Sequence, residues 1–96
     1  MMTVTVKVMG PLINLVGAST FDMTLPEGAT LWELLEVLFQ QYGEALRQEV
    51  MNPQGTDLAP YYKLLVNGRN SKLMDYLDTK LEAGQLVHVM PPIAGG

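Results

Sequence analysis

Cysteine is absent from the 96 residues, and this absence excludes several kinds of chemistry at once. Without thiols the chain forms no disulfide, binds no metal through thiolates and offers no cysteine nucleophile. Histidine is almost as scarce, since His88 is the only one. A zinc site would need carboxylates alone beside that single imidazole, which is an unusual ligand set. The sequence therefore predicts no metal site.

Basic residues are few and scattered. Six Lys and Arg stand against ten Asp and Glu, which gives a net charge of −4. The six are Lys7, Arg47, Lys63, Arg69, Lys72 and Lys80. Because binding to a phosphate backbone needs clustered Lys and Arg, we expect no nucleic-acid partner.

Long apolar runs are missing too, although 48% of the residues are hydrophobic. No run approaches the ~20 residues that a membrane-spanning helix needs. The first residues, MMTVTVKV, lack the charged start and apolar block of a signal peptide. The length suits one domain. We therefore expect a cytoplasmic protein with no membrane partner.

Strands are predicted near both ends of the chain. Residues 3–8 and 20–25 alternate apolar and polar side chains, which is typical of half-buried strands. We predict that they form a hairpin around an irregular loop at residues 10–19. Residues 62–70 predict a further strand with a tight turn at Asn67-Gly68. After irregular turns, residues 86–90 predict the last strand.

One helix is predicted strongly. Thr30 followed by Glu33 is a capping-box pair that places a helix start, and Gly43 marks its end. Apolar residues between them form a single stripe at Leu31, Leu34, Leu35, Leu38 and Tyr42. A second, short helix is predicted at residues 45–51. This order of elements predicts an α+β domain in which a mixed sheet covers one main helix.

No set of residues forms a conventional active site. The carboxylate pairs Glu33/Glu36 and Asp75/Asp78 are typical of solvated helix or turn faces rather than of acid–base catalysis. Neither serine lies in a nucleophile motif, and we interpret His88 as a structural or surface residue. The chain is therefore not predicted to be an enzyme on its own. We expect a substrate or carrier for other proteins.

The sequence ends in PPIAGG, and this ending is its most unusual feature. Pro91 and Pro92 lack backbone donors, so the last strand must leave the sheet as an extended arm. Gly95 and Gly96 have no side chains beyond hydrogen, so they can enter a narrow channel. We predict a domain at residues 1–90 and a flexible Gly-Gly arm at residues 91–96. A carboxylate at the tip becomes reactive once ATP adenylates it.

These features together resemble one family. The predicted strand and helix order, the VNGR turn and the ending LEAGQLVHVMPPIAGG are similar to the MoaD/ThiS family of ubiquitin-like β-grasp sulfur carriers. The likeness covers essentially the whole chain, and it is greatest to the small subunit of molybdopterin synthase. It implies a ubiquitin-like β-grasp fold with a protruding C-terminal arm.

The resemblance also implies a function. A ubiquitin-activating-like adenylyltransferase would use ATP to adenylate Gly96, which would then become a thiocarboxylate. The large subunit of molybdopterin synthase would accept the arm, and the sulfur would pass to a pyranopterin precursor in molybdenum cofactor biosynthesis. No cofactor would be bound, because sulfur is carried covalently. The family often has an aromatic residue where this chain has Met90, and residues 44–62 exceed what a minimal carrier needs.

Two alternatives stay open. The carrier could serve another pathway, such as thiamin synthesis, tRNA thiolation or a tungsten cofactor. It could instead be a protein modifier that is joined to lysines through Gly96, because the activated terminus is chemically the same.

A partner surface is predicted at the root of the arm. If alternate residues of the last strand are core, then His88 and Met90 share the opposite face with Leu65 of the neighbouring strand. Exposed apolar patches mark interfaces. The predicted partner-binding residues are Leu65, His88, Met90, Pro91, Pro92, Ile93, Ala94 and Gly95.

Overall fold

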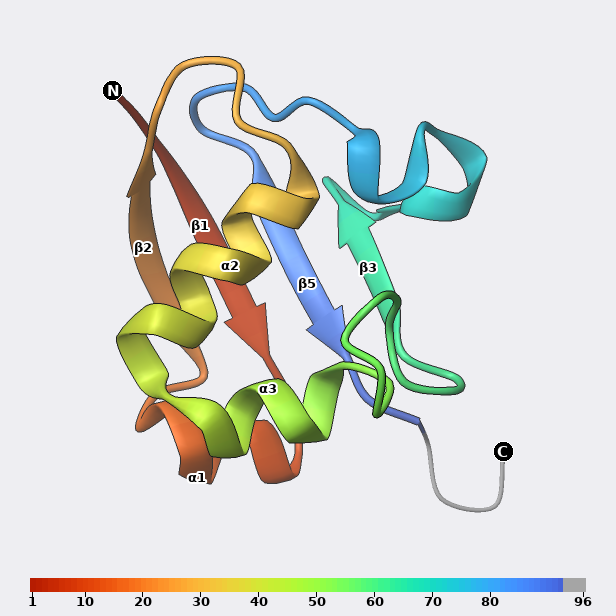
Figure 1. Cartoon of the computed structure of the whole chain (residues 1–96). Coiled ribbons are helices and arrows are strands. Elements are labelled where there is room, and N and C mark those ends of the chain that lie inside the picture. Colours follow the sequence, from red (N-terminus) through yellow and green to blue (C-terminus); the bar gives the residue numbers. More distant parts are fainter. Residues whose placement is uncertain (93–96) are drawn as a thin grey trace.

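A computed structural model describes residues 1–92 (Figure 1). Three helices, two single-turn 3-10 helices and five strands follow one another in the order β1, α1, β2, α2, α3, β3, β4, η1, η2, β5. The strands are β1 (Met2–Val8), β2 (Thr20–Leu25), β3 (Lys63–Val66), β4 (Arg69–Asn70) and β5 (Leu86–Met90). The helices are α1 (Pro11–Val16), α2 (Leu31–Tyr42), α3 (Glu44–Val50), η1 (Ser71–Leu73) and η2 (Tyr76–Asp78).

The strands form one mixed sheet in the order β2-β1-β5-β3-β4. β1 pairs antiparallel with β2, as predicted for the first hairpin. β5 lies in the middle, parallel to β1 and antiparallel to β3. The α+β, ubiquitin-like β-grasp fold predicted from the sequence is therefore confirmed.

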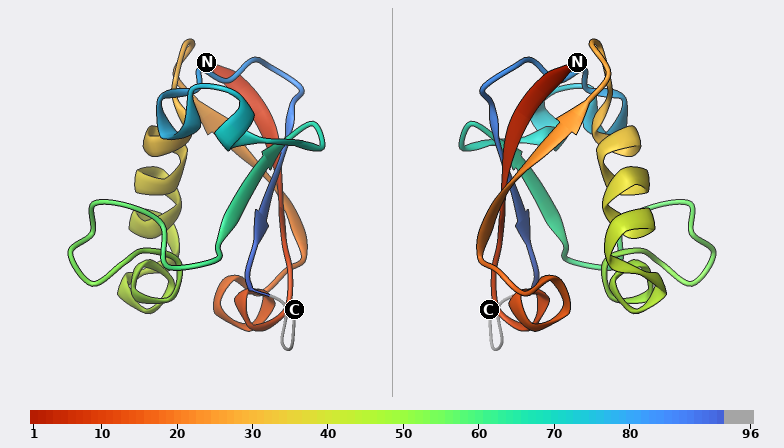
Figure 2. Two further views of the ribbon diagram at one scale, coloured as in Figure 1. Left: turned by 90° about the vertical axis from the view of Figure 1, so that its right-hand side faces the viewer. Right: turned by 90° about the vertical axis from the view of Figure 1, so that its left-hand side faces the viewer.

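The helices cover one face of this sheet (Figure 2). Val4 and Val6 on β1 and Val87 and Val89 on β5 are buried beneath them, and α2 contributes Leu31, Leu34, Leu35, Leu38 and Phe39 to the same core. Burying a leucine or valine side chain of this kind stabilises the fold by roughly 1.5–3 kcal/mol. The outer face of the sheet carries no helix in the described part of the chain.

The ends of α2 agree with the prediction. The Thr30 hydroxyl accepts a hydrogen bond from the Glu33 backbone N–H at 3.2 Å, and the Glu33 carboxylate accepts one from the Thr30 N–H at 3.3 Å. Both partners of the capping box are thus in place. Gly43 ends the helix, and its N–H donates to the Phe39 carbonyl. The short helix predicted at residues 45–51 is α3, displaced by one residue.

The loop predicted at residues 10–19 is wrong in one respect, because it contains α1. Pro11 supplies the fixed φ that suits a first helical position, and Gly17 ends the helix in the left-handed conformation with φ 89°. Leu12 is fully buried, so packing holds this short helix. Gly10 offers no capping side chain, so Pro11 was the only helix start signal in this part of the sequence.

None of the described helices is long and apolar enough to cross a lipid bilayer.

Candidate functional site

β5 leads from the centre of the sheet to Pro91 and Pro92, where the predicted arm begins. Both edges of β5 are hydrogen-bonded, one to β1 and the other to β3. Val87 and Val89 face the core, so Leu86, His88 and Met90 must face the outer side. Figure 1 shows β5 running towards the end of the molecule that also holds α1 and the start of β3. The arm therefore begins at this end, which we call the arm end.

Half-buried apolar side chains lie together on the outer face. Leu65 is the direct cross-strand partner of His88, so the structure brings together two predicted partner-binding residues. Met90 lies on the same face of β5. Leu86 belongs to the same row and was missed by the sequence reasoning, although its i, i+2 spacing from His88 pointed to it. We call Leu65, Leu86, His88 and Met90 the outer-face patch.

Two lysines border this patch. Lys7 is aligned with His88 across the β1–β5 pairing, and Lys63 is aligned with Met90 across the β3–β5 pairing. Both lysines are exposed. A partner that covers the outer-face patch would therefore gain from carboxylates placed opposite Lys7 and Lys63.

His88 has no catalytic neighbours among the described residues. Its Nδ1 atom is buried and has no hydrogen-bond partner in residues 1–92. Its two cross-strand neighbours are Lys7 and Leu65, neither of which can orient an imidazole as a general base. The geometry thus agrees with a surface role for His88 rather than with membership of a catalytic dyad.

The root of the arm is packed against the start of α1. Pro91 is half-buried and Pro92 is exposed. A Cβ atom added to Gly10 would lie 3.7 Å from Cγ of Pro91, so the two segments are in near contact. Ile93, Ala94, Gly95 and Gly96, the remaining predicted site residues, lie outside the described residues.

Two tyrosine–carboxylate hydrogen bonds hold residues 44–62, one within the segment and one between the segment and Tyr76. The Tyr62 hydroxyl donates to Oε2 of Glu49 at 2.7 Å, and the Tyr76 hydroxyl donates to Oδ1 of Asp57 at 2.6 Å. Burial, followed by the bond to Glu49, raises the pKa of Tyr62 above its ordinary value, and burial with the Asp57 bond does the same for the pKa of Tyr76. Both hydroxyls therefore stay protonated as donors at neutral pH.

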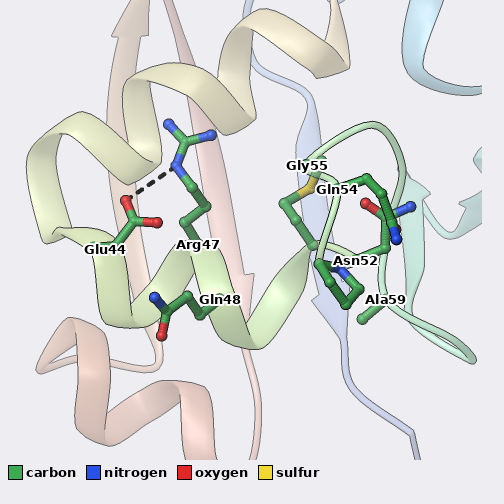
Figure 3. Close-up of a pocket in the computed structure, with 9 residues that line it drawn as sticks. Glu44, Arg47, Gln48, Asn52, Gln54, Gly55 and Ala59 are labelled. Atoms are coloured by element: carbon green, nitrogen blue, oxygen red, sulfur yellow. Dashed lines mark ion pairs between the residues drawn. The ribbon is translucent and has the colours of Figure 1, made fainter.

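An open hollow of about 800 Å³ lies beside α3 (Figure 3). Glu44 and Arg47 line it and form an ion pair of 3.4 Å between Nε and Oε2. The Arg47 guanidinium also lies 5.0 Å from the centre of the Phe39 ring. The other polar groups are neutral amides, from Gln48, Asn52 and Gln54. The one carboxylate of this lining, from Glu44, is thus paired with Arg47.

Metal ligands do not gather anywhere in residues 1–92. No group of three or more His, Asp or Glu side chains in this part of the chain could hold a metal ion.

Comparison with known proteins agrees with this arrangement. Residues 6–96 match the model of the ThiS family. A protein of Archaeoglobus fulgidus whose name proposes it as a sulfur carrier is 33% identical over 70 residues, which are 73% of this chain and 77% of that protein. Small archaeal modifier protein 3 of Haloferax volcanii is 29% identical over 83 residues, covering 86% and 87% of the two chains.

A solved structure shows the same fold. The crystal structure of small archaeal modifier protein 1 from Haloferax volcanii superposes with a TM-score of 0.85 and covers 97% of this chain and 100% of that one, at 22% identity. The predicted family is confirmed, whereas the narrower assignment to the small subunit of molybdopterin synthase stays a prediction. The family model spans nearly the whole sequence, and the chain therefore belongs to the ThiS family, with a ubiquitin-like β-grasp fold.

Proposed function

We propose that this protein is a carrier whose Gly96 carboxylate is activated and then bears sulfur as a thiocarboxylate. The observation that carries the proposal is the origin of the arm. The Pro-Pro-Ile-Ala-Gly-Gly segment continues directly from β5, which is held on both edges at the centre of the sheet. A reactive tip on such an anchor can be presented to another protein while the domain itself stays folded.

The chemistry needs an external enzyme. A carboxylate oxygen of Gly96 attacks the α-phosphorus of ATP, and pyrophosphate leaves. Hydrosulfide from a sulfur donor then attacks the carbonyl carbon, and AMP leaves with the electron pair of the broken C–O bond. The product is a thiocarboxylate, and no side-chain thiol of the carrier is needed, in keeping with the absence of cysteine. A ubiquitin-activating-like adenylyltransferase is the partner for the first step.

The outer-face patch is the proposed docking surface for these partners. Leu86, His88 and Met90 lie on β5, which leads to the arm, and Leu65 lies opposite His88 on β3. Lys7 and Lys63 border them. A mixed apolar and charged surface of this kind suits a transient interface. The arm residues Pro91 to Gly95 would occupy the channel that leads to the partner's active site.

The more specific part of the proposal concerns the protein that receives the sulfur. The large subunit of molybdopterin synthase remains the recipient that the sequence resemblance implies, with sulfur passing to a pyranopterin precursor. Thiamin synthesis, tRNA thiolation and a tungsten cofactor are served by the same chemistry. In each case the carrier is not catalytic on its own.

Protein modification is the second candidate function, and the similarity to small archaeal modifier protein 3 favours it. Here a lysine amine of a target attacks the glycyl adenylate or a thioester derived from it, and an isopeptide bond forms at Gly96. The two functions differ only in the nucleophile, so one chain can perform both.

Intact-mass analysis tests the proposal. The protein is incubated with the adenylating enzyme of the same organism, ATP and a sulfur donor, and we expect one oxygen to be replaced by sulfur. Trypsin cleaves after Lys80, so the change should lie in the peptide of residues 81–96. A variant with one residue added after Gly96 is the control and should stay unmodified. An unchanged wild-type mass with an enzyme that is active on another carrier would contradict the proposal.

The same peptide distinguishes the second candidate. Residues 81–96 joined to a lysine of another protein in cell extract would demonstrate modification. Thiocarboxylate without any such conjugate would leave sulfur transfer as the sole function.

A further inference from the structure

Three residues other than glycine have a positive φ in the described chain: Tyr61 at 67°, Asn67 at 49° and Tyr76 at 52°. For an L-residue with a side chain this left-handed conformation costs roughly 1–2 kcal/mol. Such a cost persists where the surrounding structure compensates for it or where function requires it. Each of the three therefore needs a reason.

In two of them the side chain makes a favourable contact. Asn67 precedes Gly68 in the two-residue turn between β3 and β4, where asparagine with positive φ is favoured. Its side-chain oxygen also accepts a hydrogen bond of 2.7 Å from the Leu86 N–H. Tyr76 packs against the core, and its hydroxyl donates to Asp57. In both cases a favourable contact offsets the strain.

Tyr61 lies at the third position of a turn that the Tyr62 N–H closes on the Ala59 carbonyl at 3.1 Å, where a positive φ is required, but its ring, unlike that of Tyr76, does not pack against the core. Its side chain is 82% exposed, the largest exposure of any large hydrophobic residue in the described chain. The folded domain therefore gains little from packing this ring. Its neighbour Tyr62 is only 5% exposed and is bound to Glu49, so the backbone next to Tyr61 is held in place. The domain thus presents a solvated aromatic ring from a backbone position in the left-handed conformation.

The position of Tyr61 connects it to the arm. Lys63 is aligned with Met90 in the antiparallel pairing of β3 and β5. The chain that enters β3 and the chain that leaves β5 therefore lie at the same end of the sheet, as Figure 1 shows. Tyr61 precedes Lys63 by two residues, and the arm begins directly after Met90. Tyr61 accordingly lies at the arm end.

The surface around Tyr61 is positively charged. Tyr61, Lys63 and Lys72 line one open hollow of about 400 Å³. Asp57 also lines it, and its Oδ1 atom accepts hydrogen bonds from the Tyr76 hydroxyl and the Leu58 N–H, so the hollow holds two cations and one anion. Both lysines are exposed, and neither forms an ion pair with a described residue. In a chain of net charge −4, this hollow offers cations to a partner that bears carboxylates.

We propose that Tyr61 anchors the enzyme that adenylates Gly96, by entering an apolar socket whose rim carries carboxylates opposite Lys63 and Lys72. This inference rests on the proposed function. Four residues beyond Pro92 span about 14 Å at most. An active site that receives Gly96 must therefore bring its own surface against the arm end. Exposed tyrosines are enriched among the residues that contribute most to protein interfaces.

Steady-state ATP–pyrophosphate exchange by the adenylating enzyme of the same organism, at varied carrier concentration, tests the anchor. For Tyr61→Asn we expect the KM for the carrier to rise about tenfold with kcat unchanged. Its thermal midpoint should not fall, because asparagine tolerates positive φ better than tyrosine. Tyr61→Phe keeps the ring and should behave as wild type. A lowered midpoint with an unchanged KM would show that Tyr61 serves the fold and would overturn the proposal.

Charge reversal tests the rim. The double variant Lys63→Glu, Lys72→Glu should raise the KM for the carrier. Added salt should then change this KM less than it changes the KM of the wild-type carrier. Lys80→Glu is the matched control, because Lys80 is exposed but does not line the hollow.

The outcomes separate this inference from the proposed function. If Tyr61→Asn and the double lysine variant keep the wild-type KM while deletion of Gly96 abolishes exchange, the anchor is wrong and the carrier function stands. If the wild-type carrier supports no exchange with a competent enzyme, both are wrong.

Discussion

The hydroxyl of Tyr62 and the carboxylate of Glu49 meet at 2.7 Å across 13 positions of the sequence. Tyr62 precedes β3, and Glu49 lies on α3, so this one hydrogen bond joins the helical layer to the sheet near the arm end. It also closes residues 50–61 into a loop with fixed ends. The segment that exceeds a minimal carrier is thereby made part of the domain.

Removing that hydroxyl should weaken the domain. Tyr62→Phe keeps the buried ring but loses a hydrogen bond to a charged acceptor, which is worth about 1.5–3 kcal/mol. We expect a lower free energy of unfolding in urea with an unchanged m-value. Tyr42→Phe is the control, because the Tyr42 ring packs edge-on against Phe21 and its hydroxyl has no hydrogen bond among the described side chains. Equal stability of Tyr62→Phe and wild type would show that water replaces the bond without loss.

Alkaline pH should have a related effect. The pKa of Tyr62 is raised in the folded state, by burial and by Glu49, so above about pH 10 the unfolded chain releases a proton that the folded chain keeps. The stability linked to this group is present below pH 10 and is lost as pH rises further. Unfolding measured from pH 8 to 11 should therefore show a steeper decline for wild type than for Tyr62→Phe. Parallel curves would contradict the linkage.

The capping box of α2 gives a third prediction. Thr30→Ala removes the acceptor for the Glu33 N–H and should cost about 1 kcal/mol. The thermal midpoint should fall by several degrees in a domain of this size. Gln40→Ala, at an exposed position of the same helix, should leave the midpoint nearly unchanged.

Changes at the tip of the arm should abolish function without affecting stability. Deleting Gly96 moves the carboxylate by about 3.5 Å, well beyond the roughly 0.5 Å that a productive site tolerates. Gly95→Val introduces a branched side chain into the proposed channel. Thiocarboxylate formation, followed by intact mass, should be lost in both, while their thermal midpoints match wild type. Retained formation in Gly95→Val would show that the channel is wide.

The outer-face patch can be tested separately from the arm. Met90→Asp places a charge in the half-buried row beside His88 and should weaken binding to the large subunit of the sulfur-accepting synthase by about tenfold or more, as calorimetry would measure. Thr24→Asp on β2 is the matched control, because it lies on the same face but on the edge strand away from β5. If both variants bind like wild type, the partner does not cover this patch.

Local sequence signals predicted most of the elements. The capping box and the apolar stripe placed α2, the Asn67-Gly68 pair placed the β3–β4 turn, and alternation placed β5. These features depend on neighbours in the chain, so a single sequence contains them. α1 was missed because its short helix is held by the burial of Leu12 rather than by a cap.

The properties that define the candidate site depend on distant contacts. Alternation showed which side chains of β5 share a face, but pairing with β3 decides that Leu65 lies opposite His88. The conformation of Tyr61 contradicts the preference of its residue type. It becomes visible only in the folded backbone, where Tyr62 on one side and the turn from Pro60 on the other fix it.

The central place of β5 determines how the domain responds to force. A partner that pulls on the arm pulls along β5, whose hydrogen bonds to β1 and β3 run across the direction of that pull. The force is then shared by the hydrogen bonds of both strand pairings at once. On an edge strand that is pulled away from its sheet, the bonds would instead break one after another. The carrier can therefore be drawn by its tip into a narrow site, and released from it, as an intact folded unit.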